Sequence, residues 1–332
     1  MINNKKYKKQ LYYYEKFGEI CKTGYNVDSF GHNAMMPQLL NKGGMRCYVM
    51  MRPGMHENSE IPENLFWWDS PDGSRVLTYR IRDCYCVSGK NGIDNELPIL
   101  RERAENTGHG MMMFFGVGNH GGGPTKGDLD YLRELKENGY EELEYSSPDD
   151  YFAEMCADKD LDLPVWSDEL QHHASGCYSA TSMVKQLNRK AEYWLANAEK
   201  WNTVCGKITD LPKATEEFGK AWQEVCFNQF HDILPGSSIQ QVYDDANRDY
   251  EYVLQQCEKL IQDRLAAIAT ATGGENGIFV MNNTPFTTGG VIKLNGVSRY
   301  IENVPARGYA LVQPVDCNNS VQVSASFMEN DY

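Results

Sequence analysis

Residues 22–51, KTGYNVDSFGHNAMMPQLLNKGGMRCYVMM, predict a strand, a helix and a second strand in direct succession. The first strand covers residues 22–27 and ends at Asp28. The helix covers residues 34–41, and the apolar second strand covers residues 46–51. Strands that alternate with helices are typical of a parallel sheet or barrel with both faces covered. The stretch therefore places the N-terminal half of the chain in the α/β class.

The sequence on both sides of this stretch continues the α/β pattern. Residues 66–81 predict a β-hairpin, because Asp72-Gly73 is a strong tight-turn dipeptide between two β-prone runs. The apolar run MMMFFGV at residues 111–117 predicts a buried strand. Helices are expected at residues 5–19, 96–106 and 126–138.

After about residue 165 the pattern changes to long amphipathic helices. Three apolar stripes recur at helical spacing, which predicts a helical bundle. Ser238-Ile-Gln-Gln241 predicts a capping box at the start of the third helix. From Gly273 the composition favours β structure, with short runs at residues 277–281 and 308–312. The stripes are Val184, Leu187, Ala191, Leu195, Ala198 and Trp201; then Phe218, Trp222 and Val225; then Ile239, Val242, Ala246, Tyr250, Val253, Cys257 and Leu260.

The bulk composition excludes several classes of protein. The 332 residues include 41% hydrophobic and 23% charged residues, which is ordinary for a globular protein, and the net charge of −14 argues against nucleic acid and anionic membrane surfaces as partners. No apolar run is long enough for a membrane span, and the basic N-terminal residues are not followed by the apolar region of a signal peptide. The ten cysteines are scattered without a CxxC motif, so we expect free thiols and a cytoplasmic location.

Polar side chains follow three of the predicted strands. Asp28 ends the first strand, Arg52 follows the second, and Asn119 and His120 follow the run at residues 111–117. In barrels of alternating strands and helices, reacting groups gather at the carboxyl ends of the strands. A shared site and ordinary structural loops are both compatible with this pattern. His32 either contacts a substrate or braces the loop after Asp28.

A fourth polar cluster, FNQFHDILPGSS, lies between two of the predicted bundle helices and contains His231 and Asp232. A His-Asp pair in a loop is commonly surface chemistry or a helix cap. The functional alternative is a metal ligand backed by a carboxylate.

Six segments, in this order along the chain, resemble family-38 α-mannosidases of the bacterial type. They are NVDSFGHNAMMPQLL, MRPG, FWWDSPDGSRVLTYRI, GVGNHGGGPT, ELQHHASGCYSA and NQFHDILPGSSI. The resemblance implies a partial seven-stranded α/β barrel over residues 1–165, a three-helix bundle over residues 166–272, and the start of a C-terminal β-sandwich domain over residues 273–332. It also implies retaining, zinc-dependent hydrolysis of terminal α-mannosyl residues from glycans or oligosaccharides.

The resemblance implies a role for individual side chains. Asp28 matches the family's nucleophile, which also binds zinc, and His231 matches a zinc-binding histidine. Phe30 matches an aromatic residue beneath the sugar. The remaining implied contacts to the substrate are Arg52, Asn119, His120 and Asp232. These residue types suit the chemistry, because a retaining glycosidase needs a carboxylate nucleophile and zinc accepts imidazole and carboxylate ligands.

The acid/base is expected at Glu169 or Asp168, and His172 and His173 are alternatives for lining the site. Two further zinc ligands are expected from a His-x-Asp motif, which is absent from this chain. We therefore expect an internal fragment that lacks the first barrel strand and most of the β domain, and that is inactive by itself. The alternative is a carbohydrate-binding or structural homologue that keeps the fold without the reaction. The expected partners are α-mannosides or mannose-containing glycans.

Overall fold

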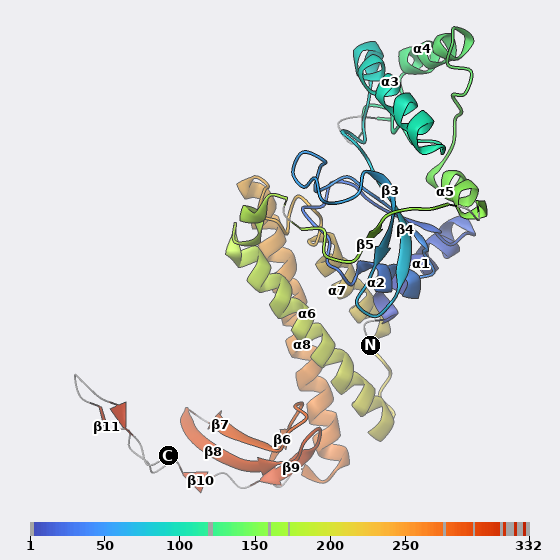
Figure 1. Cartoon of the computed structure of the whole chain (residues 1–332). Helices are drawn as coiled ribbons and strands as arrows, with labels where there is room; N and C mark the ends of the chain where they lie inside the picture. Colours follow the sequence, from blue (N-terminus) through green and yellow to red (C-terminus); the bar gives the residue numbers. More distant parts are fainter. Residues whose placement is uncertain are drawn as a thin grey trace. The chain divides into compact units, whose positions relative to one another are not determined.

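The computed structural model describes residues 3–118, 122–158, 161–171, 173–274, 277–294 and 296–312, and the short pairs 315–316, 322–323 and 328–329. It divides into two compact units, Met1–Ser179 and Ala180–Tyr332, which are described separately (Figure 1).

The first unit is built on a five-stranded mixed sheet in the order β1-β2-β4-β3-β5. Strands β1, β2 and β4 are parallel neighbours, β3 is antiparallel to β4, and β5 is parallel to β3. The sheet strands are β1 (Thr23–Asn26), β2 (Cys47–Met50), β3 (Asn64–Asp69), β4 (Arg75–Arg80) and β5 (Val165–Trp166). The helices are α1 (Asn3–Phe17), α2 (Met36–Lys42), α3 (Gly89–Thr107), α4 (Lys126–Glu137) and α5 (Pro148–Ala157), with a 3₁₀ turn η1 (Ser175–Tyr178).

Both faces of this sheet are buried, as the alternating strands and helices predicted. On β2, Val49 belongs to one hydrophobic cluster, together with Tyr151 and Phe152 of α5. Met50 belongs to a second cluster, on the opposite face, which includes Leu40 of α2. Because successive side chains of a strand point to opposite faces, each strand contributes to both clusters. The predicted hairpin is also present as β3 and β4, and Gly73 in its turn has a φ of 81°.

The prediction of a buried strand over residues 111–117 is wrong. The only ladder contact of this run is an isolated parallel bridge between Phe115 and Val87. The backbone N–H and C=O of Met112 are satisfied by the hydroxyl of Tyr79, at 3.0 Å each. Met112 packs against the α5 side of the sheet, whereas Met113 packs against α3 and α4. The run alternates between two cores, which gives it a strand-like pattern without a strand.

The second unit is dominated by α6 (Ser182–Ile208), α7 (Thr215–Phe227) and α8 (Gln240–Ala271), and Figure 1 shows α6 and α8 running side by side. The apolar stripes predicted from the sequence meet in one core, except for Trp201, which lies outside this cluster, and Ile239, which is 71% exposed. The predicted capping box at Ser238 is wrong, because the residue that caps α8 is Ile239, without a side-chain bond. Instead, the Ser238 N–H donates to the hydroxyl of Tyr243 at 2.8 Å.

The chain after α8 forms short antiparallel strands. The two predicted β runs appear as β6 (Ile278–Met281) and β9 (Tyr309–Val312), which pair with each other. A second sheet contains β7 (Thr288–Leu294), β8 (Val297–Val304) and β10 (Val315–Asp316), and β11 (Gln322–Val323) pairs with β12 (Met328–Glu329). Within the described residues, no helix combines the length and the apolar character that a membrane crossing requires.

Candidate active site

Asp28 and Arg52 meet at the carboxyl ends of two neighbouring parallel strands. Asp28 lies two residues after β1, and Arg52 lies two residues after β2. The Arg52 Nε donates to Asp28 Oδ1 at 2.9 Å, and both side chains keep partial exposure, 30% for Arg52 and 24% for Asp28. The structure therefore brings together two of the side chains that the sequence placed in one site, and leaves the carboxylate reachable.

His32 braces the loop that carries Asp28. The side chain is 2% exposed. Its Nε2 lies 3.0 Å from the carbonyl oxygen of Arg52, and its Nδ1 lies 2.9 Å from the hydroxyl of Tyr48. Its backbone also exchanges two hydrogen bonds with Leu170. Burial lowers the pKa of His32 to about 4, so the ring is neutral near pH 7. Of the two roles left open by the sequence, the structure favours bracing.

Tyr85 was not predicted as a site residue, yet it lies beside the Asp28–Arg52 pair. Burial raises the pKa of its phenol first, and the negative charge of Asp28 raises it further, while Arg52 opposes the shift. The segment Cys84–Tyr85–Cys86 follows β4, the third strand of the parallel set. The strand-end pattern that pointed to Asp28 and Arg52 would have found Tyr85 if β4 had been counted with them.

Phe30 takes part in a second polar and aromatic group. Its ring stacks on His173, with the ring centres 5.5 Å apart and the planes 24° from parallel. His173 Nδ1 bonds the carboxylate of Glu57, which also accepts the Gly54 N–H at 2.6 Å. Burial works against ionisation of Glu57, but these two bonds outweigh it and lower its pKa. Glu57 was missed from the sequence, because its partner His173 lies 116 residues away.

The two candidates for the acid/base, Asp168 and Glu169, are exposed and lie two and three residues after β5. Asp168 Oδ1 accepts the backbone N–H of Glu169 at 2.7 Å, and the Asp168 carbonyl accepts the indole N–H of Trp68 at 2.9 Å. The Glu169 charge raises the pKa of Tyr178, after a larger effect of burial. The Tyr178 hydroxyl in turn donates to the Phe30 carbonyl at 3.2 Å. Glu169 therefore lies on the side of the site that carries Phe30.

His231 and Asp232 lie in the second unit, in the turns between α7 and α8. The His231 Nε2 is 3.7 Å from Asp232 Oδ2, and the imidazole is 4.1 Å from the Phe230 ring, measured between centres. Asn119, His120 and His172 lie outside the described residues. Within the described ranges, no group of three or more His, Cys, Asp or Glu side chains is arranged to hold a metal ion.

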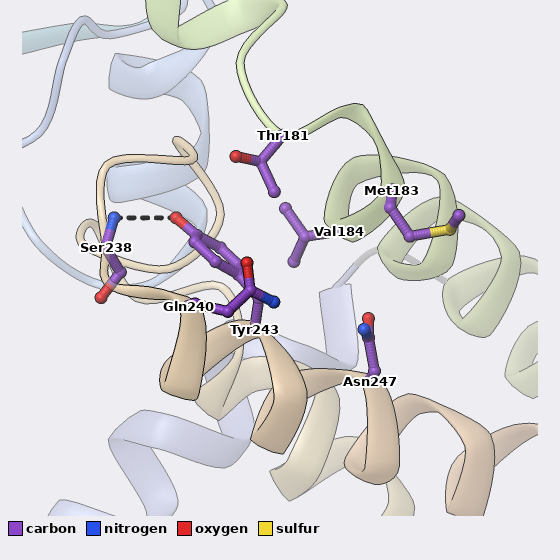
Figure 2. A pocket seen from close by; sticks show the side chains of 7 residues that line it. All are labelled: Thr181, Met183, Val184, Ser238, Gln240, Tyr243 and Asn247. Atoms are coloured by element: carbon purple, nitrogen blue, oxygen red, sulfur yellow. Dashed lines mark hydrogen bonds between the residues drawn. The ribbon is translucent and has the colours of Figure 1, made fainter.

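A separate cavity of about 290 Å³ lies in the second unit, between the first turns of α6 and α8 (Figure 2). Hydroxyl, amide and apolar side chains line it, without a carboxylate or an imidazole, so it offers no group for acid/base chemistry. None of the residues predicted for the site is among them. The lining residues are Thr181, Met183, Val184, Ser238, Gln240, Tyr243 and Asn247.

Comparison with known proteins finds two family models that match this chain. Residues 4–169 match the glycosyl hydrolases family 38 N-terminal domain, and residues 172–268 match the alpha mannosidase middle domain. The chain is 28% identical over 315 residues to human alpha-mannosidase 2C1, covering 92% of this chain and 30% of that protein. It is 29% identical over 259 residues to alpha-mannosidase G of Dictyostelium discoideum, covering 76% of this chain and 23% of that protein.

A solved structure supports the fold. An alpha-mannosidase from Enterococcus faecalis V583 superposes with a TM-score of 0.70 at 20% identity, covering 84% of this chain and 34% of that one. The chain thus spans about a third or less of the lengths of these relatives. With half of its residues matched to the family 38 N-terminal domain and most of the remainder to the alpha mannosidase middle domain, the chain belongs to glycosyl hydrolase family 38.

Proposed function

We propose that this chain carries part of the active site of an α-mannosidase that hydrolyses terminal α-mannosyl residues with retention of configuration. One observation carries the proposal: the Asp28–Arg52 pair lies at the carboxyl ends of two adjacent parallel strands in a member of family 38. The names of the relatives, which are alpha-mannosidases, support mannosides as the substrate class. The proposed substrates are α-mannosides or mannose-containing glycans.

In the proposed reaction, a carboxylate oxygen of Asp28 attacks the anomeric carbon and forms a covalent glycosyl-enzyme. The Arg52 guanidinium holds this carboxylate through Nε at 2.9 Å and balances its charge before attack. The position of Arg52 depends on the bond between its carbonyl oxygen and His32. Phe30, stacked on His173, offers an aromatic surface of the kind that packs against the apolar face of a sugar ring.

The proposed general acid is Glu169 or Asp168. It gives its proton to the leaving oxygen and then takes a proton from the water that releases the sugar, so that the acid is regenerated. In retaining enzymes the two carboxyl groups stand about 5–5.5 Å apart. The location of Glu169 beside Tyr178, which bonds the Phe30 backbone, favours Glu169. The carboxylate of Asp168 is occupied with the Glu169 N–H.

We further propose that zinc binding in the whole protein uses Asp28 and His231 together with two ligands from a His-x-Asp motif that this chain lacks. Imidazole and carboxylate donors suit zinc. Asn119, His120 and Asp232 remain proposed contacts to the substrate. The proposed architecture is a seven-stranded barrel to which residues 1–165 contribute, a three-helix bundle over residues 166–272 and a β-sandwich that begins at residue 273.

The test uses the complete protein and a fluorinated mannosyl fluoride, a reagent that forms the covalent intermediate but releases it slowly. The label should appear on the peptide that contains Asp28. Asp28→Asn should lower turnover of an aryl α-mannoside by several orders of magnitude, because it removes the nucleophile. Product NMR should show retained configuration.

Asp69→Asn is the matched control, because Asp69 also pairs with an arginine, Arg75 Nε at 2.6 Å, on the neighbouring strand. It should keep turnover near that of the unsubstituted protein. Inverted product, or a label on another carboxylate, would overturn the assignment of Asp28. Binding of mannosides without hydrolysis by the complete protein would instead favour the carbohydrate-binding alternative.

A further inference from the structure

Two thiols stand next to each other beside the candidate nucleophile, and the proposed reaction uses neither. Cys84 Sγ and Cys86 Sγ are 3.0 Å apart, and the backbone N–H of Cys86 donates to Cys84 Sγ at 3.4 Å. The chain bends at Tyr85, so that both side chains turn to the same side. Both thiols are partly exposed and reduced.

The surroundings place this pair at the site. Tyr85 lies between the two cysteines, and the charges of Asp28 and Arg52 both act on the pKa of its phenol. Cys86 packs tightly against the loop at Gly118, where an added Cβ would stand 2.8 Å from the Cys86 Cβ. The Tyr85 ring also lies next to Gly118, 3.6 Å from the position of an added Cβ, so Gly118 limits movement of this segment.

We propose that Cys84 and Cys86 form a reversible intramolecular disulfide when the chain meets a low-molecular-weight disulfide such as oxidised glutathione. A disulfide needs the sulfurs at about 2.05 Å, so each has to move by only about half an ångström from the present separation. The ring would enclose a single intervening residue. It would therefore be strained, and strained disulfides are the easily reduced ones.

The chemistry balances without a further reagent. One cysteine loses its proton, its sulfur attacks glutathione disulfide, and one glutathione leaves as a thiolate. The second cysteine then attacks the protein sulfur of the mixed disulfide, forms the Cys84–Cys86 bond and releases the second glutathione. The two cysteines lose two electrons and two protons, and the glutathione disulfide accepts them.

A soft metal ion is the competing occupant of two neighbouring thiols. Within the described ranges, no third His, Cys, Asp or Glu completes a metal-holding group at this pair. Oxidation, by contrast, needs only the two sulfurs and access from solvent. Closing the ring fixes the backbone of Tyr85, and so changes the wall of the site beside Asp28.

Tryptic digestion allows a direct test, because residues 83–90, DCYCVSGK, form one peptide that holds both cysteines and no other. The full chain is reduced, exposed to glutathione buffers of rising oxidised fraction, quenched in acid and labelled with a maleimide. Mass spectrometry should show this peptide unlabelled and lighter by two hydrogen atoms than the dithiol form. Dithiothreitol should restore both labels.

The controls separate ring formation from general thiol oxidation. Cys226 is partly exposed and is the only cysteine of the tryptic peptide 221–248, so it should carry either a maleimide or one glutathione. In Cys84→Ser and in Cys86→Ser, the remaining thiol of peptide 83–90 should likewise carry a maleimide or one glutathione. Circular dichroism checks that both variants keep the helical content of the parent.

The proposal is overturned if peptide 83–90 of the unsubstituted chain still carries two maleimides, or carries two glutathiones, in the buffer with the highest oxidised fraction of glutathione. It is equally overturned if Cys84 or Cys86 is found cross-linked to a different cysteine of the chain. Neither result depends on hydrolysis of mannosides, so the disulfide and the proposed function fail or stand separately.

Discussion

Acidification should weaken the first unit through one side chain, His32. This imidazole is buried, and burial lowers its pKa from 6.5 to about 4. Between these two values the unfolded chain binds a proton that the folded chain rejects. Stability from this group is therefore complete above pH 6.5 and is lost as the pH falls toward 4. The substitution that tests it is His32→Gln, because the Gln amide can still donate to the Arg52 carbonyl and does not titrate.

The size of the effect follows from the two pKa values. Each unit of difference is worth about 1.4 kcal/mol, so the full loss approaches roughly 3 kcal/mol below pH 4. Between about pH 7 and pH 5 the two titration curves predict a loss of roughly 2 kcal/mol. With a urea dependence of about 2 kcal/mol per molar, the midpoint of unfolding moves down by about 1 M.

Hydrogen exchange of peptides from β2 and β4 measures the opening of the first unit alone, since core strands exchange through global unfolding. The free energy of opening should fall with pH more steeply in the unsubstituted chain than in His32→Gln, by about 2 kcal/mol over this range. His56→Gln is the control, because His56 is exposed, and its profile should follow the unsubstituted chain. Parallel profiles for the unsubstituted chain and His32→Gln would refute the reasoning.

Three further substitutions test the packing of the chain. Arg80 is fully buried and donates to three backbone carbonyls at 2.8–3.0 Å. Arg80→Met should therefore destabilise the first unit by about 3–5 kcal/mol, measured by unfolding in urea. Arg133 is exposed, so the control Arg133→Met should cost about 0.5 kcal/mol or less. Leu195→Ala should open a cavity in the helical core and cost about 2–5 kcal/mol, measured by exchange of α6 and α8 peptides. Thr125→Ala removes the cap formed with Asp128 and should cost about 1 kcal/mol, seen as faster exchange in the first turn of α4.

Elements with a strong apolar period were predictable from the sequence. The stripes of α6, α7 and α8 and the hairpin at Gly73 follow from local spacing alone. The start of α3 could not be predicted from local spacing. The helix begins at Gly89, and the next residues include a second glycine, so this stretch resembles a turn. Tertiary structure determines where this helix begins: Asp128 Oδ1 accepts the Gly89 N–H at 2.7 Å, and Ile93 is completely buried. Tertiary contacts therefore outweigh local propensity here.

The residues of the candidate site can also be sorted into those that the sequence could predict and those that it could not. Asp28 and Arg52 could be predicted, because each follows a recognisable strand and the carboxyl ends of parallel strands lie at one edge. The contact between Glu57 and His173 could not, because nothing local in the sequence relates them. Tyr85 was obscured for another reason. Tyr85 follows β4, which the sequence shows only as one strand of a hairpin. The sheet order is needed to show that β4 is also the parallel neighbour of β2.

The neutral state of His32 connects this packing to the site. A carbonyl oxygen can only accept, so the bond at 3.0 Å to the Arg52 carbonyl requires a proton on Nε2. In the neutral ring, Nδ1 then has no proton and accepts from the hydroxyl of Tyr48, which the side chain of Asn26 on β1 also bonds. Burial therefore selects the neutral charge state, and the Arg52 carbonyl selects the tautomer. That tautomer ties the end of β1 to the backbone of Arg52, whose side chain holds Asp28. The orientation of the proposed nucleophile is thus set by a core residue that never needs to touch the sugar.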